Sequence, residues 1–187
     1  MKIKIGVSNR HIHLTEEMFN ILFEGKELEV VKKLSQSDDF ASNLFVTIKT
    51  SKSEIEKVRL VGPLRKYNQV EISKTDAYKL GINPPVRMSG DLEGSETVTV
   101  CSDTAEIELT NSCIIAARHI HATLEDYQKY NLKEVMSAIV ETEKGGVMSN
   151  ILVKTDPTYV LELHIDTDDA NAFLLKQGDE IEIREDL

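Results

Sequence analysis

The sequence predicts a mainly β protein made of two related β-barrel domains with short capping helices. Short β-branched or alternating segments recur along the chain, turn signals separate them, and one motif occurs twice. The predicted strands cover residues 2–7, 45–49, 57–61, 96–100, 105–109, 158–164 and 180–184. The turn signals are Gly62-Pro63, Asn83-Pro84-Pro85, Ser89-Gly90 and Gly145-Gly146.

The repeat divides the chain into two halves. The segment Val7–Glu17 recurs as Ala116–Asp126. Both copies contain Arg-His-Ile-His, which starts at Arg10 and again at Arg118, a shift of 108 residues. Further along, residues 70–77 align with residues 163–170, which puts Glu71 and His164 at equivalent positions. We therefore expect one barrel over residues 1–110 and the other over residues 111–187, with an approximate boundary that allows a strand to be exchanged.

Short helices are expected after residues that can cap a helix N-terminus. Such residues precede helix formers and acidic first-turn side chains at four places, so helices are predicted to begin at Thr15, Thr75, Thr123 and Asp168. The polar segment 32–42 is predicted to be a loop.

Composition excludes several classes of protein. The formal net charge of −10 argues against a general nucleic-acid binder, which needs a basic surface for phosphates. No apolar run is long enough to cross a membrane, and the N-terminus does not read as a signal peptide. The two cysteines, Cys101 and Cys113, form neither a disulfide framework nor a Cys-rich zinc finger. These observations favour a cytoplasmic protein.

All five histidines fall in the repeated pattern. On a strand, alternate side chains share a face, so each His-x-His pair can converge on one ion. With one further ligand from the downstream strand, two metal sites are predicted. Their ligands are His11, His13 and Glu71 for one zinc ion, and His119, His121 and His164 for the other. Three protein ligands leave an open position, which is typical of catalytic zinc.

Basic side chains near these ligands are candidates for binding an anionic substrate. Arg65 follows the Gly62-Pro63 turn and precedes Glu71 by six residues, and its guanidinium can bind phosphate bidentately. Arg10 and Arg118 flank the two His-x-His pairs on the opposite strand face and are interpreted as structural or ligand-rim residues. The loop 89–95 reads equally well as a hairpin turn or a phosphate cradle.

Five segments together resemble the PduL-type phosphate propanoyltransferase family. They are residues 7–15, 62–73, 89–92, 116–121 and 163–171, and the resemblance spans nearly the whole chain. It implies a dizinc enzyme with two β-barrel domains that converts acyl-CoA and inorganic phosphate to acyl phosphate and CoA, with propanoyl or acetyl as the acyl group. Propanediol degradation is the metabolic setting implied.

By matching positions, the resemblance implies the same six metal ligands and assigns phosphate binding to Arg65. It places the CoA contacts at Val7, Ser8, Asn9, Lys52, Arg59 and Asn171. Members targeted to bacterial microcompartments carry an N-terminal extension, whereas here Met1 lies ten residues before His11, so a free cytoplasmic enzyme is expected and association with a microcompartment stays open. The repeat is compatible with a homodimer but does not require one.

In the hypothesised mechanism, the zinc of His11, His13 and Glu71 meets the thioester or the CoA sulfur. The three-histidine zinc orients phosphate or the developing oxyanion, and Arg65 holds phosphate for attack. No protein nucleophile is required.

Two other functions stay open. The spacing His-x-His-x₃-Glu, ending at Glu17 and Glu125, mimics the ligands of a bicupin oxygenase, although both glutamates fall in the first turn of predicted helices. A zinc-binding or zinc-sensing module is the non-enzymatic alternative, but such sites normally close the metal's coordination shell. A metallohydrolase is disfavoured because no Asp-His continuation follows the histidine pairs.

Overall fold

The computed structural model describes residues 1–36 and 38–185 and confirms the mainly β fold class. The chain divides into two compact units. Unit 1 comprises residues 1–9, 35–37 and 117–187, and unit 2 comprises residues 10–34 and 38–116. The first nine residues thus belong with the second half of the sequence, and unit 2 extends to residue 116.

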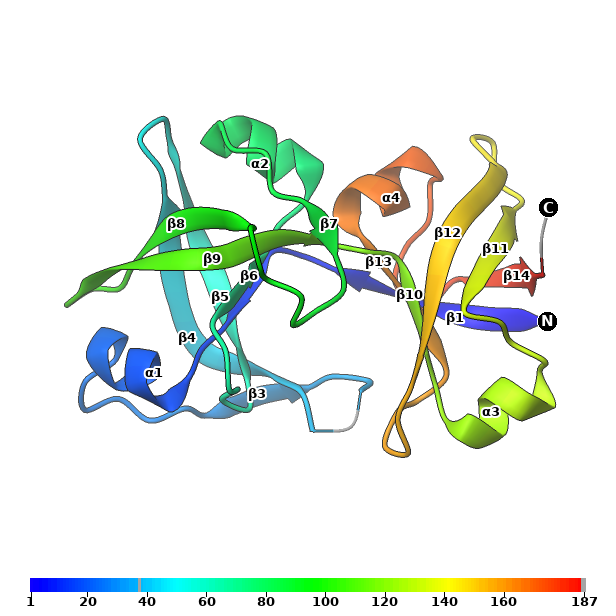
Figure 1. The fold of residues 1–187 in the computed structure, drawn as a ribbon, viewed down its shortest axis with the longest axis horizontal. Helices are drawn as coiled ribbons and strands as arrows, with labels where there is room; N and C mark the ends of the chain where they lie inside the picture. Colours follow the sequence, from blue (N-terminus) through cyan, green and yellow to red (C-terminus); the bar gives the residue numbers. More distant parts are fainter. Residues whose placement is uncertain (37, 186–187) are drawn as a thin grey trace. The chain divides into compact units, whose positions relative to one another are not determined.

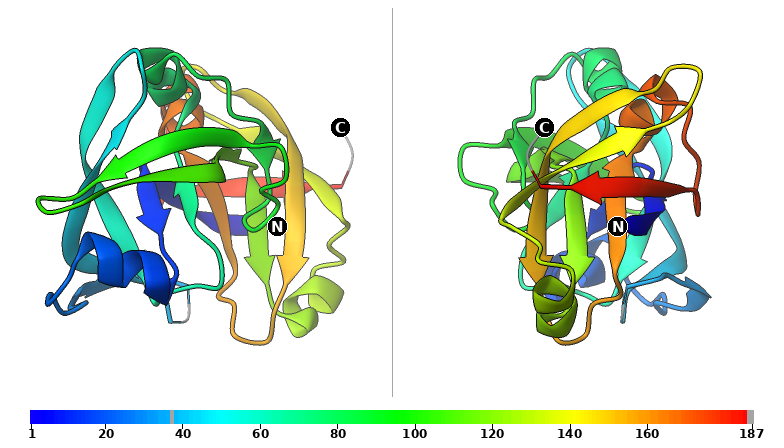
Figure 2. Two further views of the ribbon diagram at one scale, coloured as in Figure 1. Left: turned by 60° about the vertical axis from the view of Figure 1, so that its left-hand side comes forward. Right: turned by 90° about the vertical axis from the view of Figure 1, so that its right-hand side faces the viewer.

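Unit 1 contains a closed barrel with the strand order β1-β13-β10-β12-β11-β14. Its strands can be followed in Figure 1 and, from β14 in red to β12 in yellow, in the right-hand panel of Figure 2. The strands are β1 (Lys2–Ser8), β10 (His119–Ala122), β11 (Val135–Val140), β12 (Gly146–Thr155), β13 (Glu162–Asp166) and β14 (Glu180–Arg184). Helices α3 (Leu124–Lys129) and α4 (Thr167–Ala172) complete the unit.

Unit 2 repeats this arrangement. Strand pairings run β4-β5-β2-β6-β9-β8 and return from β8 to β4, which closes a second barrel. Its strands are β2 (His11–His13), β4 (Phe40–Lys49), β5 (Glu54–Gly62), β6 (Gln69–Glu71), β8 (Glu96–Cys101) and β9 (Glu106–Ala116). Strands β3 (Val30–Lys33) and β7 (Val86–Arg87) pair with β4 and β9, and the helices are α1 (Glu16–Leu22) and α2 (Lys74–Leu80). The β8–β9 hairpin is the long green arm in the left panel of Figure 2.

The two barrels share their pairing directions strand for strand. In unit 2, β2 is parallel to β5 and antiparallel to β6, which is itself parallel to β9. In unit 1, β10 is parallel to β12 and antiparallel to β13, which is parallel to β1. Hence β9 and β1 hold equivalent places, yet each precedes the His-x-His motif of the other unit in the sequence.

Each barrel has its own apolar core, because inward-facing residues alternate along every strand. Ile12, Leu60 and Val70 lie in the core of unit 2, and Ile5, Ile120 and Leu163 in that of unit 1. Ile12 and Ile120 are the central residues of the two His-x-His motifs. Burying the isoleucine turns both flanking histidines to the outside of the barrel wall.

Most predicted elements are present, with shifted ends. Thr15 and Thr123 cap α1 and α3 as expected, whereas α2 and α4 begin earlier, after the caps Ser73 and Asp166. Strand β13 begins at Glu162, so the predicted strand over 158–164 starts too early. The segment 32–42 is only partly loop, because β3 ends at Lys33 and β4 starts at Phe40. No helix in the described part of the chain is long and apolar enough to span a membrane.

Candidate metal centres and substrate-binding residues

The first predicted ligand set comes together in unit 2. His11 and Glu71 are direct register partners on β2 and β6, and one ligand atom from each of His11, His13 and Glu71 lies within 4.8 Å of the others. His11 Nε2 and Glu71 Oε2 are 3.6 Å apart. Two ligands of a tetrahedral zinc ion lie about 3.4 Å apart when the bonds are about 2.05 Å, so this spacing fits an ion held between them.

A backbone contact orients His13. Its Nδ1 lies 3.0 Å from the carbonyl oxygen of Val61, which favours the tautomer that donates from Nδ1. Nε2 is then left as the ligand atom, and an outer hydrogen bond of this kind is usual for metal-binding histidines. The side chain is 2% exposed. Burial, followed by the nearby His11 and Arg65, lowers the pKa of His13 well below its usual value, so the ring stays in the neutral, metal-binding form.

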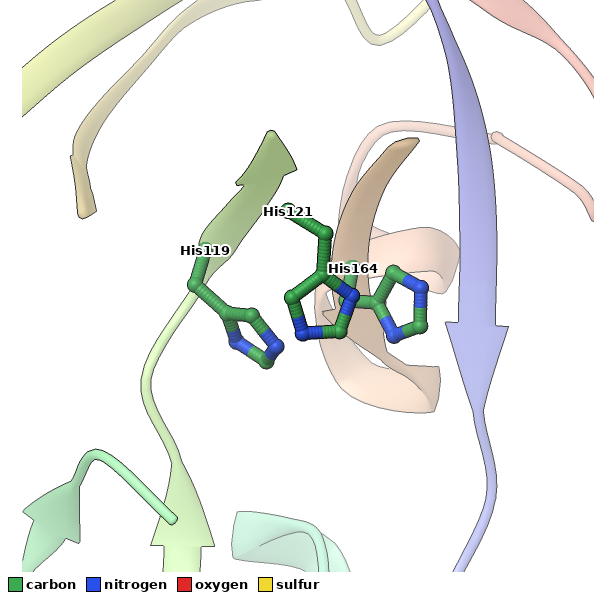
Figure 3. Close-up of side chains that lie close together, drawn as sticks. All are labelled: His119, His121 and His164. Carbon is green, nitrogen blue, oxygen red and sulfur yellow. The ribbon is translucent and has the colours of Figure 1, made fainter. Parts of the chain in front are cut away.

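The second ligand set comes together in unit 1, where Figure 3 shows the three imidazole rings converging. His119 and His164 are register partners on β10 and β13, and their ring centroids lie 5.3 Å apart. The rings of His121 and His164 are 4.5 Å apart, and ligand atoms of the three residues lie within 4.8 Å of one another. Three imidazoles form a ligand set that suits zinc.

Hydrogen bonds also orient the rings of His119 and His164 in this set. His119 Nδ1 lies 2.7 Å from the carbonyl oxygen of Ala117, which leaves Nε2 for an ion. Burial, followed by the charge of Lys154, lowers the pKa of His119 to about 3. His164 Nε2 lies 2.7 Å from Glu162 Oε2, which leaves Nδ1. Burial alone would raise the pKa of Glu162, but hydrogen bonds from His164 and Ser35 lower it overall, so this residue is a carboxylate.

Arg65 lies near the ligand set of unit 2. Its backbone nitrogen donates to the carbonyl oxygen of Leu14 over 2.8 Å, which holds it beside the end of the His-x-His segment. Its guanidinium contacts Tyr67 Oη at 3.2 Å, Ser89 Oγ at 3.3 Å and Asp39 Oδ2 at 3.2 Å. Burial lowers the pKa of Arg65, but Asp39 and Tyr67 raise it more, so the group stays charged. A fixed, charged fork of this kind can bind an oxyanion.

Arg10 and Arg118 form equivalent ion pairs. Arg10 Nε contacts Asp76 Oδ2 at 2.8 Å, and Arg118 contacts both oxygens of Asp169. Asp76 and Asp169 lie in the first turns of α2 and α4, directly after the strands that carry the third ligands. Each pair thus ties the start of a His-x-His strand to the helix that follows Glu71 or His164. This arrangement is structural.

The residues expected to contact CoA lie in both units. In unit 1, Val7 and Ser8 end β1 beside Ile165 and Asp166, Asn9 follows them, and Asn171 lies on α4. In unit 2, Arg59 is the register partner of His11 and stacks on the ring of Phe45 at 4.2 Å, while Lys52 donates to the carbonyl oxygen of Tyr78.

Several residues near the ligand sets were not identified from the sequence. Gln69 and Glu162 stand two positions before Glu71 and His164, so they share the outer face of β6 and β13 with them. Extending the repeat alignment by one residue upstream would have paired them. Nothing in the local sequence marks Ser35, Gln36 or Asp39, because their contacts come from chain segments far apart in sequence.

The two glutamates whose spacing resembles the ligands of a bicupin oxygenase lie outside both ligand sets. Glu17 and Glu125 are exposed in the first turns of α1 and α3, where acidic residues interact favourably with the helix N-terminus. Glu71 and His164 are instead the side chains that lie beside the two His-x-His pairs.

Comparison with known proteins agrees with the resemblance seen in the sequence. A family model for phosphate propanoyltransferase matches residues 4–176. The chain is 45% identical to the phosphate propanoyltransferase of Limosilactobacillus reuteri over 174 residues, covering 91% of this chain and 81% of that protein. It is 43% identical to that of Thermotoga maritima over 187 residues, covering 98% of this chain and 89% of that protein. The chain therefore belongs to the phosphate propanoyltransferase family and is an acyltransferase.

Proposed function

We propose that this chain transfers a propanoyl or acetyl group between CoA and inorganic phosphate, with one zinc ion held in each unit. The observation that carries the proposal is the repeated ligand geometry, because the same strand pairing brings three metal-competent side chains together in both barrels. Family relatives named phosphate propanoyltransferase support the reaction class.

The donor sets favour zinc. Two histidines with one glutamate, and three histidines, are ligand sets found at catalytic zinc, which keeps a further position open for substrate or water. A zinc ion bound there supplies a Lewis acid for the thioester carbonyl and a thiophilic partner for sulfur. The buried, neutral state of His13 and His119 suits metal binding, because no proton has to be displaced at neutral pH.

Arg65 is proposed to bind inorganic phosphate. Its guanidinium is charged and partly buried, and Tyr67, Ser89 and Asp39 fix its direction. A phosphate oxygen would replace the Asp39 carboxylate, since both are anionic acceptors for the same fork. The bound phosphate is then held for attack, which removes much of the entropy cost of a reaction between two substrates.

The proposed reaction balances without a protein nucleophile. A phosphate oxygen attacks the thioester carbonyl carbon, a carbon–oxygen bond forms, and the carbon–sulfur bond breaks. The products are acyl phosphate and the thiolate of CoA. Val7, Ser8, Asn9, Lys52, Arg59 and Asn171 are proposed to contact CoA. A cytoplasmic location and a homodimer stay predictions.

The test measures free thiol released from propanoyl-CoA and acetyl-CoA, with and without phosphate, by protein of known zinc content. We expect thiol release that requires phosphate and disappears when a chelator removes the metal. Release that ignores phosphate would mean a thioesterase. Zinc-loaded protein that releases no thiol would favour a zinc-binding module.

A further inference from the structure

The two ligand sets share a feature beyond their six ligands: a buried polar residue stands two positions before the third ligand in each unit. Gln69 precedes Glu71 on β6, and Glu162 precedes His164 on β13. Gln69 is the register partner of His13, and Glu162 that of His121, so the two positions are equivalent. Their exposed fractions are 0% and 6%.

In unit 2, the amide of Gln69 has only one direction that satisfies its neighbours. The backbone N–H of Gly90 donates to Gln69 Oε1 over 2.7 Å. The Nε2 group must therefore be the donor, and it reaches Glu71 Oε1 at 2.6 Å and Ser89 Oγ at 2.9 Å. Glu71 keeps its other oxygen toward His11. An amide donor thus orients a carboxylate ligand.

In unit 1, the chemistry is reversed to suit a histidine ligand. Glu162 Oε2 accepts from His164 Nε2 over 2.7 Å, and also from the hydroxyl of Ser35. Gln36 exchanges two hydrogen bonds with the backbone of Val160, which directs its Nε2 toward Glu162 at 3.4 Å. A carboxylate acceptor thus fixes the tautomer of an imidazole ligand and leaves Nδ1 for the ion.

Gly6 supplies the room that this pair needs. It is the register partner of His164 on β1, and its backbone has no positive φ that would itself call for glycine. A Cβ there would lie 3.0 Å from Glu162 Oε2 and 3.1 Å from His164 Nε2. The absence of a side chain at Gly6 therefore accommodates the hydrogen bond between Glu162 and His164.

We propose that Gln69 and Glu162 are positioning residues, each matched to the third ligand of its own metal centre. The inference rests on the metal centres of the proposed function. A glutamate ligand needs an amide donor beside it, and a histidine ligand needs a carboxylate acceptor; we call this the pairing rule. Two carboxylates in these places would repel each other, and an apolar partner would leave the third ligand unoriented.

The sharpest test exchanges ligand and partner in unit 1. We expect His164→Glu to lose the zinc of unit 1, because the new carboxylate would face Glu162. The double variant His164→Glu with Glu162→Gln recreates the chemistry of Gln69 and Glu71. It should bind zinc again, within about tenfold of the wild-type affinity. Zinc is counted by elemental analysis, and affinity is measured by competition with a chromophoric chelator.

Two further variants keep the test decisive if the double variant folds poorly. Glu162→Leu and Gly6→Ala should each weaken zinc binding in unit 1 by about 10- to 100-fold, the usual effect of losing an outer hydrogen bond to a ligand. The centre in unit 2 provides an internal reference. Glu182→Gln is the matched control, since Glu182 lies on β14 of the same unit and pairs with Arg184.

The outcomes separate this inference from the proposed function. Wild-type protein that binds no zinc would overturn both. Wild-type protein with two zinc ions, together with a folded Glu162→Leu variant of unchanged affinity, would overturn the positioning role alone. A folded double variant no better than His164→Glu would contradict the pairing rule.

Discussion

Arg118 holds Asp169 from two nitrogens, with Nε 2.9 Å from one carboxylate oxygen and Nη2 2.7 Å from the other. The same guanidinium donates to the carbonyl oxygen of Ser149 over 3.0 Å. One side chain therefore joins three segments of unit 1: the approach to β10, the strand β12 and the helix α4. Arg10 and Asp76 form the equivalent link in unit 2, where Arg10 Nε lies 2.8 Å from Asp76 Oδ2.

Replacing Arg118 with alanine should destabilise unit 1. Asp169 would lose a forked partner in a partly buried place, and hydrogen bonds to charged groups contribute about 1.5–3 kcal/mol. Arg118→Lys should recover only part of the loss, because an ammonium cannot form the fork. Urea denaturation measures the change. Lys133→Ala, which breaks an exposed pair with Glu185, is the control and should cost less than about 1 kcal/mol. An equal effect of the two alanine variants would contradict the role of the fork.

Replacing His164 with alanine should remove about one of two zinc ions, because two histidines alone leave that centre with too few ligands. Elemental analysis of the purified variant gives the stoichiometry. The ion proposed to be held by His11, His13 and Glu71 should be unaffected. A His164→Ala variant that keeps both ions would remove His164 from the ligand set.

Glu17→Ala and Glu125→Ala should leave the zinc content unchanged. Both side chains are exposed in the first turns of their helices, outside the two ligand clusters. We expect at most a small loss of helix stability, about 0.3–1 kcal/mol for each. Metal loss from either variant would revive the bicupin ligand assignment.

Replacing Arg65 with alanine should impair the use of phosphate while zinc content stays at the wild-type level. The guanidinium is the proposed phosphate ligand, whereas it donates to no metal ligand. Loss of a charged clamp of this kind lowers the rate by about 10²–10³ or raises KM for phosphate. Initial rates at varied phosphate concentration measure both. Arg184→Ala, on β14 of unit 1, is the arginine control. Zinc loss in Arg65→Ala would reassign this residue to maintaining the metal centre.

Cys113 should react with thiol reagents only after unfolding. Burial, with a smaller effect of Glu96, raises the pKa of the Cys113 thiol from 9.0 to about 12. At pH 8 we therefore expect the folded protein to hold Cys113 almost wholly as the unreactive thiol. A chromogenic disulfide added to a Cys101→Ser variant at pH 8, with and without denaturant, measures this. Rapid stoichiometric labelling of the folded variant would show that Cys113 is accessible.

The sequence was informative where the repeat preserved side-chain chemistry. The Arg-His-Ile-His copies and the alignment of Glu71 with His164 were enough to predict both ligand clusters, because a strand fixes which side chains share a face. The same rule, extended one residue upstream, would have identified Gln69 and Glu162, for which we propose a positioning role. Helix starts were less certain, because Ser73 and Thr75, or Asp166 and Asp168, can all act as caps.

Features that depend on distant segments could not be predicted. Strand partners are chosen by long-range pairing, so nothing local in β1 or β9 shows which barrel it joins. The contact of Ser35 with Glu162 spans 127 residues, and no spacing rule relates them. Such contacts can be identified only from the three-dimensional structure.

Because β1 belongs to unit 1, the strands of the two units become available for folding at different times during synthesis. All residues of unit 2 have been synthesised once residue 116 has been added, whereas β1 must wait for β13 and β14 near the opposite end of the chain. Domains generally fold as units during synthesis. We therefore expect His119, His121 and His164 to come together after unit 2 has folded, and β1 to remain without its strand partners until β13 and β14 have been synthesised.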